Sequence, residues 1–380
     1  MSRSDVSLRR SRVVLTGYFL GLGVVMAVWG ARMPAVQHAA HLTTGSLSLV
    51  LLAAAVGMVA GLQAGGRLAR PERLPALLIG GAVALTAALA VLGQCRTLAS
   101  LLAAALAFGA THGVLDVAAN TGAVRCQHAY GKPIMSSLHA AYSIGALVGA
   151  ALAAATAGTA HSTLFLAVGA VLAVGVLAAV PRTLPLSGTD PILLSPHGGR
   201  HRTTGSVWLL GALAAASLLG EGAAADWAAV HVHGLHAGTA VAASSFALYS
   251  TGMAIGRLTG DRLTTRFGAP AVVRAGAVLA ATALATGVLA DSVPAALVGW
   301  AVFGLGLSGT VPSLITAAGS HGPGAVATVS VTGYLGLLAG PALIGALASI
   351  TTLPTALLLP ALLAAALAAL AHRALENTAP

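Results

Sequence analysis

The stretch GMVAGLQAGGRL at 57–68 returns as GMAIGRLTGDRL at 252–263, 195 residues further along the chain. The same spacing of 195 residues matches positions within this stretch and after it. They are Gly57 with Gly252, Met58 with Met253, Gly61 with Gly256, Gly65 with Gly260, Arg67 with Arg262, Leu68 with Leu263, Pro75 with Pro270, and Phe108–Gly109 with Phe303–Gly304. A register held this long predicts two structural repeats, one in each half of the chain.

The composition around these repeats is that of an integral membrane protein. Hydrophobic residues make up 57% of the 380 residues and charged residues 7%, whereas a soluble domain has about 25% charged residues. Aromatic residues are only 4%, so small side chains must provide most of the packing, as they do where helices approach closely in lipid. Cys95 and Cys126 are expected on opposite sides of the membrane, which excludes a disulfide between them.

The apolar runs are long and continuous, which predicts helices rather than barrel strands. A membrane-spanning helix needs about 20 apolar residues. The sequence predicts twelve spans, at 13–31, 46–66, 75–94, 98–120, 135–157, 162–180, 206–230, 239–260, 270–290, 294–317, 323–349 and 353–371. We therefore expect an all-α membrane protein with two six-helix bundles, at 1–180 and 206–380, joined by a cytoplasmic loop at 181–205.

The basic residues predict the orientation. With the N-terminus inside, 17 Lys and Arg residues fall on the inner side, Arg257 among them, and only Arg32 and Arg96 fall outside. Lys and Arg are enriched in cytoplasmic loops, so both termini are expected in the cytoplasm. The net charge of +10 then follows from topology, and we expect no nucleic-acid partner.

The loop after the eighth predicted span reads GRLTGDRLTTRFG at 256–268. It resembles the Gly-x-x-x-Asp-Arg-x-x-x-Arg/Lys motif of the major facilitator superfamily, a family of secondary transporters. The resemblance implies a gating role, in which the motif stabilises the outward-facing state. The residues concerned are Gly256, Arg257, Gly260, Asp261, Arg262 and Arg266. Asp261 is expected at a neighbouring helix N-terminus; the first-half copy has Gly66 there and should be weaker. The alternative is a plain basic turn.

The fourth predicted span carries His112, Asp116 and Asn120 at intervals of four, which places them on one helical face. The run LDVAAN is similar to an acidic-x-Ala-Ala-Asn element of the fucose-permease-like branch of the superfamily. That resemblance implies substrate binding and proton coupling, with Asp116 as the proton carrier, because a low-dielectric environment favours the neutral acid. The alternatives are a structural hydrogen bond for Asp116 and a packing role for His112.

The seventh predicted span contains Glu221, Asp226 and Trp227 in GEGAAADWAAVHV. A carboxylate in the bilayer centre costs about 2.5–3.5 kcal/mol on insertion scales, so we expect Glu221 to serve in proton coupling or substrate binding. Asp226 is either a gating residue or an interfacial one. Trp227 either stacks on a substrate ring or anchors the helix at the interface.

The fifth predicted span opens with KPIMSSLHAAYSIGALVGA at 132–150. The resemblance to the fucose-permease-like branch extends here and implies substrate contacts from His139, Tyr142 and Ser143. Gly145 and Gly149 form a Gly-x-x-x-Gly packing seam. The Gly-Pro signature of drug antiporters is absent from this span.

Other polar residues have two possible roles each. Arg32, in WGARMPA, either pairs with an acid of the seventh span at an outer gate or extends its side chain to the interface. His231, His233 and His236 are spaced like a loose metal site, but we interpret them as solvated loop residues and expect no metal or other cofactor. Pro34, Pro312 and Pro341 are each expected to break a helix locally.

Our functional hypothesis is a proton-coupled transporter of a small polar solute, sugar-like by resemblance, which works by alternating access. The alternative is a proton-antiporting exporter of a metabolite or drug. A third class is a membrane receptor or an intramembrane enzyme. The sequence pairs no nucleophile with a base, which argues against this class. We expect a monomer in a bacterial inner membrane, whose partners are its solute, protons and lipid.

Overall fold

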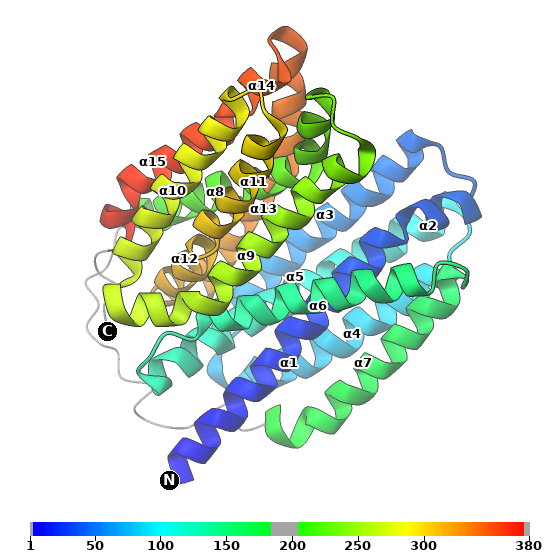
Figure 1. Ribbon diagram of the computed structural model, residues 1–380. Helices are drawn as coiled ribbons and strands as arrows, with labels where there is room; N and C mark the ends of the chain where they lie inside the picture. The colour runs from blue at the N-terminus through cyan, green and yellow to red at the C-terminus, as the bar shows by residue number, and fades with distance from the viewer. Residues whose placement is uncertain (1–2, 184–203, 376–380) are drawn as a thin grey trace. The chain divides into compact units, whose positions relative to one another are not determined.

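A computed structural model describes residues 3–183 and 204–375, and these residues form helices and no strands (Figure 1). Most of the predicted central loop therefore lies outside the described residues, with Arg200 and Arg202. The long helices are α1 (Arg3–Ala31), α3 (Thr44–Leu68), α4 (Leu74–Gln94), α5 (Leu98–Tyr130), α6 (Met135–Ala155), α7 (His161–Thr183), α8 (Thr204–Gly234), α9 (Thr239–Phe267), α10 (Ala269–Leu289), α11 (Val293–Leu307), α13 (Pro323–Ile350) and α15 (Leu358–Leu375). The short ones are α2 (Met33–Ala39), η1 (Pro71–Arg73), α12 (Thr310–Gly319) and α14 (Leu353–Ala356).

Eleven helical segments among the described residues are long and apolar enough to cross a membrane. They cover every predicted span except the eighth, which corresponds to α9. That helix has 29 residues, enough to cross, but its C-terminal half carries Arg257, Asp261, Arg262 and Arg266. The all-α membrane class predicted from the sequence is confirmed.

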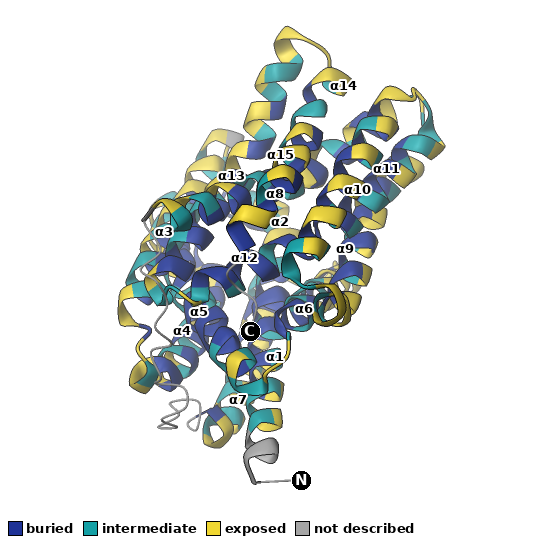
Figure 2. Ribbon diagram, turned by 90° about the vertical axis from the view of Figure 1, so that its left-hand side faces the viewer, coloured by how far each residue is buried: buried dark blue, intermediate teal, exposed yellow. Residues whose placement is uncertain are grey.

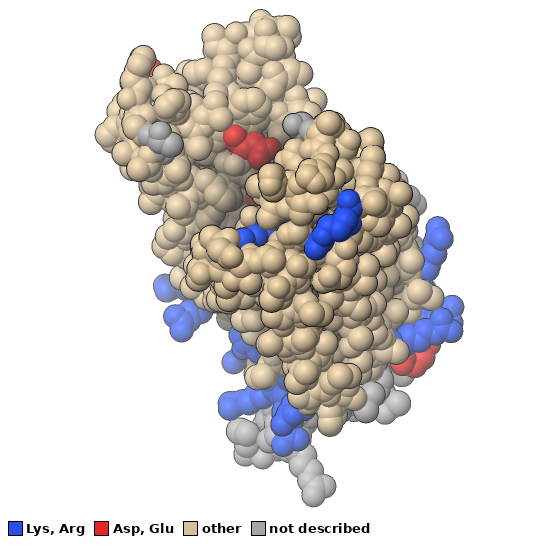
Figure 3. Space-filling view, turned by 90° about the vertical axis from the view of Figure 1, so that its right-hand side faces the viewer, with Lys and Arg blue, Asp and Glu red and all other residues tan. Residues whose placement is uncertain are grey.

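The helices present apolar side chains to their surroundings. Each long helix carries both buried and exposed residues (Figure 2), and the exposed ones include large hydrophobic side chains such as Leu147, Val171 and Ile350. Most of the face shown in Figure 3 carries neither acidic nor basic side chains. Such a surface is stable in contact with lipid rather than water.

The described residues divide into two compact units. Unit 1 comprises those of Met1–Tyr130, Leu138–His197 and Gly322–Ala327, and unit 2 comprises those of Gly131–Ser137, Gly198–His321 and Thr328–Pro380. The first residues of α6 thus belong to unit 2, and the first residues of α13 belong to unit 1. Each unit is described by itself below.

The repeat spacing of 195 residues holds in the helices. α3, α4 and α5 begin at Thr44, Leu74 and Leu98, and α9, α10 and α11 begin 195 residues later in each case. The α3–α5 and α9–α11 pairs each pack side by side. The predicted duplication is therefore present in the three-dimensional structure as well as in the sequence.

The close approaches between helices repeat at the same spacing. In unit 1, a Cβ at Gly57 would meet the Leu106 carbonyl, and one at Gly109 would meet the Ala54 carbonyl. In unit 2 the corresponding contacts are Gly252 with the Ala301 carbonyl and Gly304 with the Tyr249 carbonyl. Only glycine permits backbones to come this close. The matched glycines thus hold the same helix pair together in both units.

The two repeats differ because the second helix of this pair is continuous in unit 1 and broken in unit 2. α5 is continuous, whereas its counterpart ends as α11 at Leu307 and resumes as α12 at Thr310. Pro312 has no N–H, and its ring would clash with the carbonyl of Ser308 in a continuous helix. The break predicted for Pro312 is therefore confirmed, and it lies at Ser308–Gly309. A break also precedes Pro34, between α1 and α2. The break predicted for Pro341 is wrong, because α13 continues through that residue.

Candidate functional site

In unit 1, the acid of α5 is paired with an amide one turn away. The Asn120 Nδ2 group donates to the backbone carbonyl of Asp116 at 2.9 Å and to its Oδ1 atom at 3.3 Å. Asn120 is 2% exposed and Asp116 is half-buried, while His112, one turn before the acid, is buried. The predicted stripe is therefore present as a continuous polar face in the apolar helix α5. The Oδ1 atom of Asn120 has no hydrogen-bond partner among the described residues.

The predicted residues of α6 lie half-buried and are close to α1. The His139 ring centroid is 5.3 Å from that of Phe19 on α1, and the Ser143 hydroxyl donates to the His139 carbonyl at 3.2 Å. The Gly-x-x-x-Gly seam is confirmed, because Gly145 and Gly149 lie against the α1 backbone. Tyr142, also half-buried, lies on the same helix at the contact with α1. The seam fixes α6 against α1 and so positions all three polar side chains.

In unit 2, the acid of α8 is paired with a cation. The Arg257 Nη2 atom of α9 lies 3.9 Å from the Glu221 Oε2 atom, with side-chain exposures of 9% and 34%. Arg257 is buried within α9, whereas Arg262 and Arg266, with which the sequence grouped it, are exposed on the same helix. The sequence analysis missed this ion pair, since it does not give the rotation of α8 against α9.

A second residue of this cluster was also missed. Tyr249 lies two turns before Arg257 on α9, is 2% exposed, and its hydroxyl has no hydrogen-bond partner among the described residues. Its ring packs against Phe246 and Phe303 at centroid distances of 6.0 Å. The hydroxyl is within electrostatic range of both Glu221 and Arg257. A single tyrosine in an apolar helix gives no sequence signal for such a contact.

The other predicted residues of α8 are arranged differently from Glu221. Asp226 is exposed at the surface of unit 2. The Trp227 indole Nε1 donates to the carbonyl of Pro341 on α13 at 3.1 Å, and its ring packs against the core of this unit and against Gly345. This hydrogen bond joins α8 to α13. Trp227 therefore packs within unit 2, a role that neither interpretation of the sequence included.

The loop motif places its acid at a helix N-terminus, as the resemblance implied. The Asp261 carboxylate accepts hydrogen bonds from the backbone amides of Ser136 at 2.9 Å and Ser137 at 3.1 Å, in the first turn of α6. A Cβ at Gly260 would lie 2.7 Å from the Ser136 hydroxyl. Gly256 lies against the α11–α12 break, and Arg262 and Arg266 are exposed. The gating role of these residues stays a prediction.

The first-half copy of the motif makes its contact without a side chain. Gly66 lies against the start of α13, where an added Cβ would be 2.5 Å from the Ala327 Cβ atom and 3.2 Å from the Pro323 carbonyl. Pro323 also has no N–H to offer a carboxylate. The contact in unit 1 is therefore one of close packing, whereas that in unit 2 is polar.

Within the part of the chain that the structure describes, Arg32 neither pairs with an acid of α8 nor extends to an exposed surface, the two roles expected from the sequence. Its guanidinium is buried and donates to the carbonyls of Thr156 and Ala157 and to the Thr156 hydroxyl, just beyond the end of α6. The last carbonyls of a helix lack internal partners, and the negative end of its dipole attracts a cation. Arg32 thus caps α6 within unit 1.

The reading of the three histidines as solvated loop residues was wrong for His231. α8 continues to Gly234, so His231 and His233 are helical. His231 is 2% exposed, and its Nδ1 atom accepts a hydrogen bond from the Trp300 indole at 3.4 Å. Burial against Trp300 extends the helix beyond its predicted end at residue 230. Only His233 and His236 are exposed.

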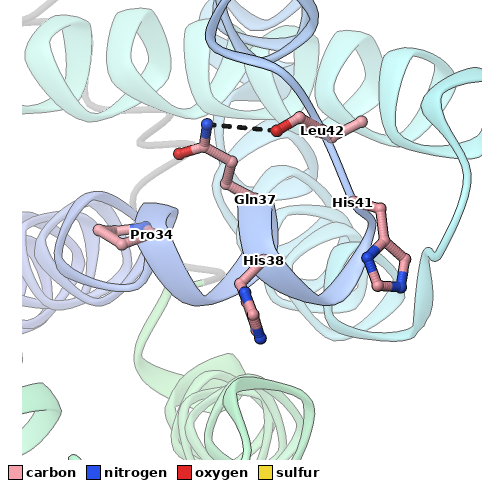
Figure 4. A pocket seen from close by; sticks show the side chains of 5 residues that line it. All are labelled: Pro34, Gln37, His38, His41 and Leu42. Atoms are coloured by element: carbon pink, nitrogen blue, oxygen red, sulfur yellow. Dashed lines mark hydrogen bonds between the residues drawn. The ribbon is translucent and has the colours of Figure 1, made fainter.

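A surface pocket lies apart from all the predicted site residues. Pro34, Gln37, His38, His41 and Leu42 line it. Figure 4 shows that the two imidazoles do not converge on one point, and that Gln37 is bonded to the Leu42 carbonyl, at 3.3 Å. Within residues 3–183 and 204–375, no group of three or more His, Cys, Asp or Glu side chains could hold a metal ion.

Comparisons with known proteins identify the family of this chain. No protein-family model matches it. The chain is 33% identical over 368 residues to an uncharacterized MFS-type transporter of Yersinia pestis, and the match covers 94% of both proteins. Among solved structures, the fucose:proton symporter of Escherichia coli superposes with a TM-score of 0.71 at 16% identity, over 96% of this chain and 98% of that one. A proton:xylose symporter superposes with a TM-score of 0.75 at 12% identity, over 97% of this chain and 95% of that one. The chain belongs to the major facilitator superfamily of transporters, and its fold is the twelve-helix fold of that family.

Proposed function

We propose that this transporter moves a small polar solute by alternating access and couples that movement to protons through Asp116. The observation that carries the proposal is the half-buried Asp116 carboxyl beside the buried amide of Asn120. An acid in this setting can exist neutral or charged without leaving the helix. The proton symporters with which the fold superposes support the same reading.

The substrate-contact set in this proposal is the polar face of α5 with the half-buried groups of α6. His112 and Asn120 come from α5, and His139, Tyr142 and Ser143 come from α6. These groups include hydrogen-bond donors and acceptors, which suit a hydroxylated or otherwise polar neutral solute. We further propose that the protein is a monomer in the bacterial cytoplasmic membrane with both termini inside, as its arginine distribution favours.

The test uses the full chain in proteoliposomes, with radiolabelled fucose, xylose and glucose offered under an imposed proton gradient. Asp116→Asn should abolish accumulation above equilibrium while leaving exchange of solute across the membrane intact. Asp291→Asn is the matched control, because Asp291 is exposed in the turn between α10 and α11, and it should behave as the unaltered protein. Full accumulation by the Asp116 variant would refute the assignment. Efflux without uptake of any of these sugars would favour the exporter.

A further inference from the structure

The ion pair of unit 2 lies at the contact of two membrane helices. Glu221 is in the middle of α8, and Arg257 lies ten residues before the end of α9. The separation of 3.9 Å allows electrostatic attraction but exceeds the roughly 2.7–2.9 Å of a charge-assisted hydrogen bond. The carboxylate is therefore held near the guanidinium without being locked to it, and it can still accept a hydrogen bond from a second donor.

Tyr249 is the candidate for this second donor. The Tyr249 hydroxyl is buried, has no hydrogen-bond partner among the described residues, and feels the charges of both Glu221 and Arg257. Buried polar groups in native proteins are nearly always hydrogen-bonded, so an exception calls for an explanation. Its ring stack with Phe246 and Phe303 fixes the hydroxyl in place. The position of the Tyr249 ring is thus fixed by packing that does not involve the charged pair.

The repeat shows that the helix packing itself does not require these polar groups. The positions in α3 that correspond to Tyr249 and Arg257 are Ala54 and Leu62. The α3–α5 pair makes the same glycine contacts as the α9–α11 pair, with apolar residues at both positions. Because an unneeded buried charge is costly in a membrane, the cluster has a task beyond holding helices together.

We propose that Arg257 and Tyr249 are positioning residues for Glu221: Arg257 holds its carboxylate ionised, and the Tyr249 hydroxyl is the hydrogen-bond partner kept for it. Glu221 is then a fixed charge of unit 2 and not a second proton carrier beside Asp116. What the fixed charge is used for rests on the proposed transport function. The charge state of Glu221 does not depend on the transport function, and it can be measured without any solute.

The measurement is infrared absorption of the full chain in lipid at neutral pH, in the region where only protonated carboxyl groups absorb. Asp116 is present in every variant, so it does not account for differences between them. We expect the spectra of the unaltered protein and Glu221→Gln to agree in this region. Arg257→Gln should gain a protonated-carboxyl band, because the guanidinium no longer favours the charged form. The double variant Glu221→Gln/Arg257→Gln should lose that band again.

Tyr249 is tested in the same background. Tyr249→Phe added to Arg257→Gln should shift the new band, since the protonated Glu221 loses a hydrogen bond. The matched control is Tyr18→Phe, which removes a buried hydroxyl bonded to Thr183 in unit 1, at 3.2 Å, and should leave the band unshifted. An unshifted band with Tyr249→Phe overturns the assignment of Tyr249.

Two results would overturn the role of Arg257. One is a band in the unaltered protein that disappears in Glu221→Gln, which would show Glu221 protonated despite the arginine. The other is a folded Arg257→Gln variant without a new band. The first comparison needs no arginine variant, so it tests the charge state of Glu221 even if Arg257→Gln does not fold. Failure of the proposed function would appear separately, as proton-driven accumulation that survives Asp116→Asn.

Discussion

The C-terminal ends of α3 and α9 make corresponding contacts by different means. In unit 2, the Asp261 carboxylate accepts two backbone hydrogen bonds from the start of α6. In unit 1, Gly66 makes the contact at the start of α13 by close packing alone. The two contacts show that the repeats share their helix packing but not their polar interactions.

The same separation holds for the membrane-embedded groups. Asp116 and Asn120 of α5 correspond to Val311 and Ile315 in α12, and Tyr249 and Arg257 of α9 correspond to Ala54 and Leu62 in α3. The glycines, in contrast, match between the repeats. The packing glycines are thus duplicated, whereas the polar residues of α5 and α9 named here lie where the repeats differ.

The largest expected effect concerns the shared scaffold. Gly109→Ala and Gly304→Ala each place a Cβ against a carbonyl oxygen of the neighbouring helix. Overpacking of this kind costs about 1–3 kcal/mol, so both variants should have lower thermal denaturation midpoints. Gly80→Ala is the control, because an added Cβ there meets nothing within 4 Å. A loss confined to one of the two glycines would contradict a shared scaffold.

A smaller effect is expected at the helix ends. Asp261→Asn removes the charge and one of two acceptors, which should cost about 1–2 kcal/mol of stability, since hydrogen bonds to charged groups contribute about 1.5–3 kcal/mol and Asp261 is partly exposed. In unit 1, Gly66→Ala should also destabilise, and Ala327→Gly in the same chain should relieve the clash. Thermal denaturation in one detergent checks both, and an Asp261→Asn variant of unaltered stability would contradict the polar contact.

The smallest effect concerns Trp227. Trp227→Phe keeps an aromatic ring but removes the donor to the Pro341 carbonyl, a loss of about 1 kcal/mol. If the residue packs and does not bind solute, the KM for transport should stay unchanged while the denaturation midpoint falls. A large rise in KM with unaltered stability would restore the stacking role.

Much of the fold could be predicted because it depends on local patterns. Apolar run length predicted the spans, and the spacing of 195 residues predicted the paired helices. The helix break followed from Pro312, and the four-residue interval of Asp116 and Asn120 placed their side chains together. Each of these follows from helical geometry within one segment or from a repeat written in the sequence.

The missed features depend on how separate helices are rotated against one another. Arg32 caps a helix that ends more than 120 residues away, and the contact of Arg257 with Glu221 requires the phase of α9 relative to α8. His231 is buried because Trp300 lies opposite it. Hydrophobic periodicity is weak in helices that are apolar on every side, so it gave no guide to these faces.

Measuring proton movement tests directly whether Asp116 carries the coupled proton. In weakly buffered proteoliposomes without an imposed gradient, addition of a transported solute should make the outer medium more alkaline as protons enter with it. Asp116→Asn should abolish this change while solute exchange continues. Proton uptake that persists in Asp116→Asn would contradict the central claim that Asp116 carries the proton.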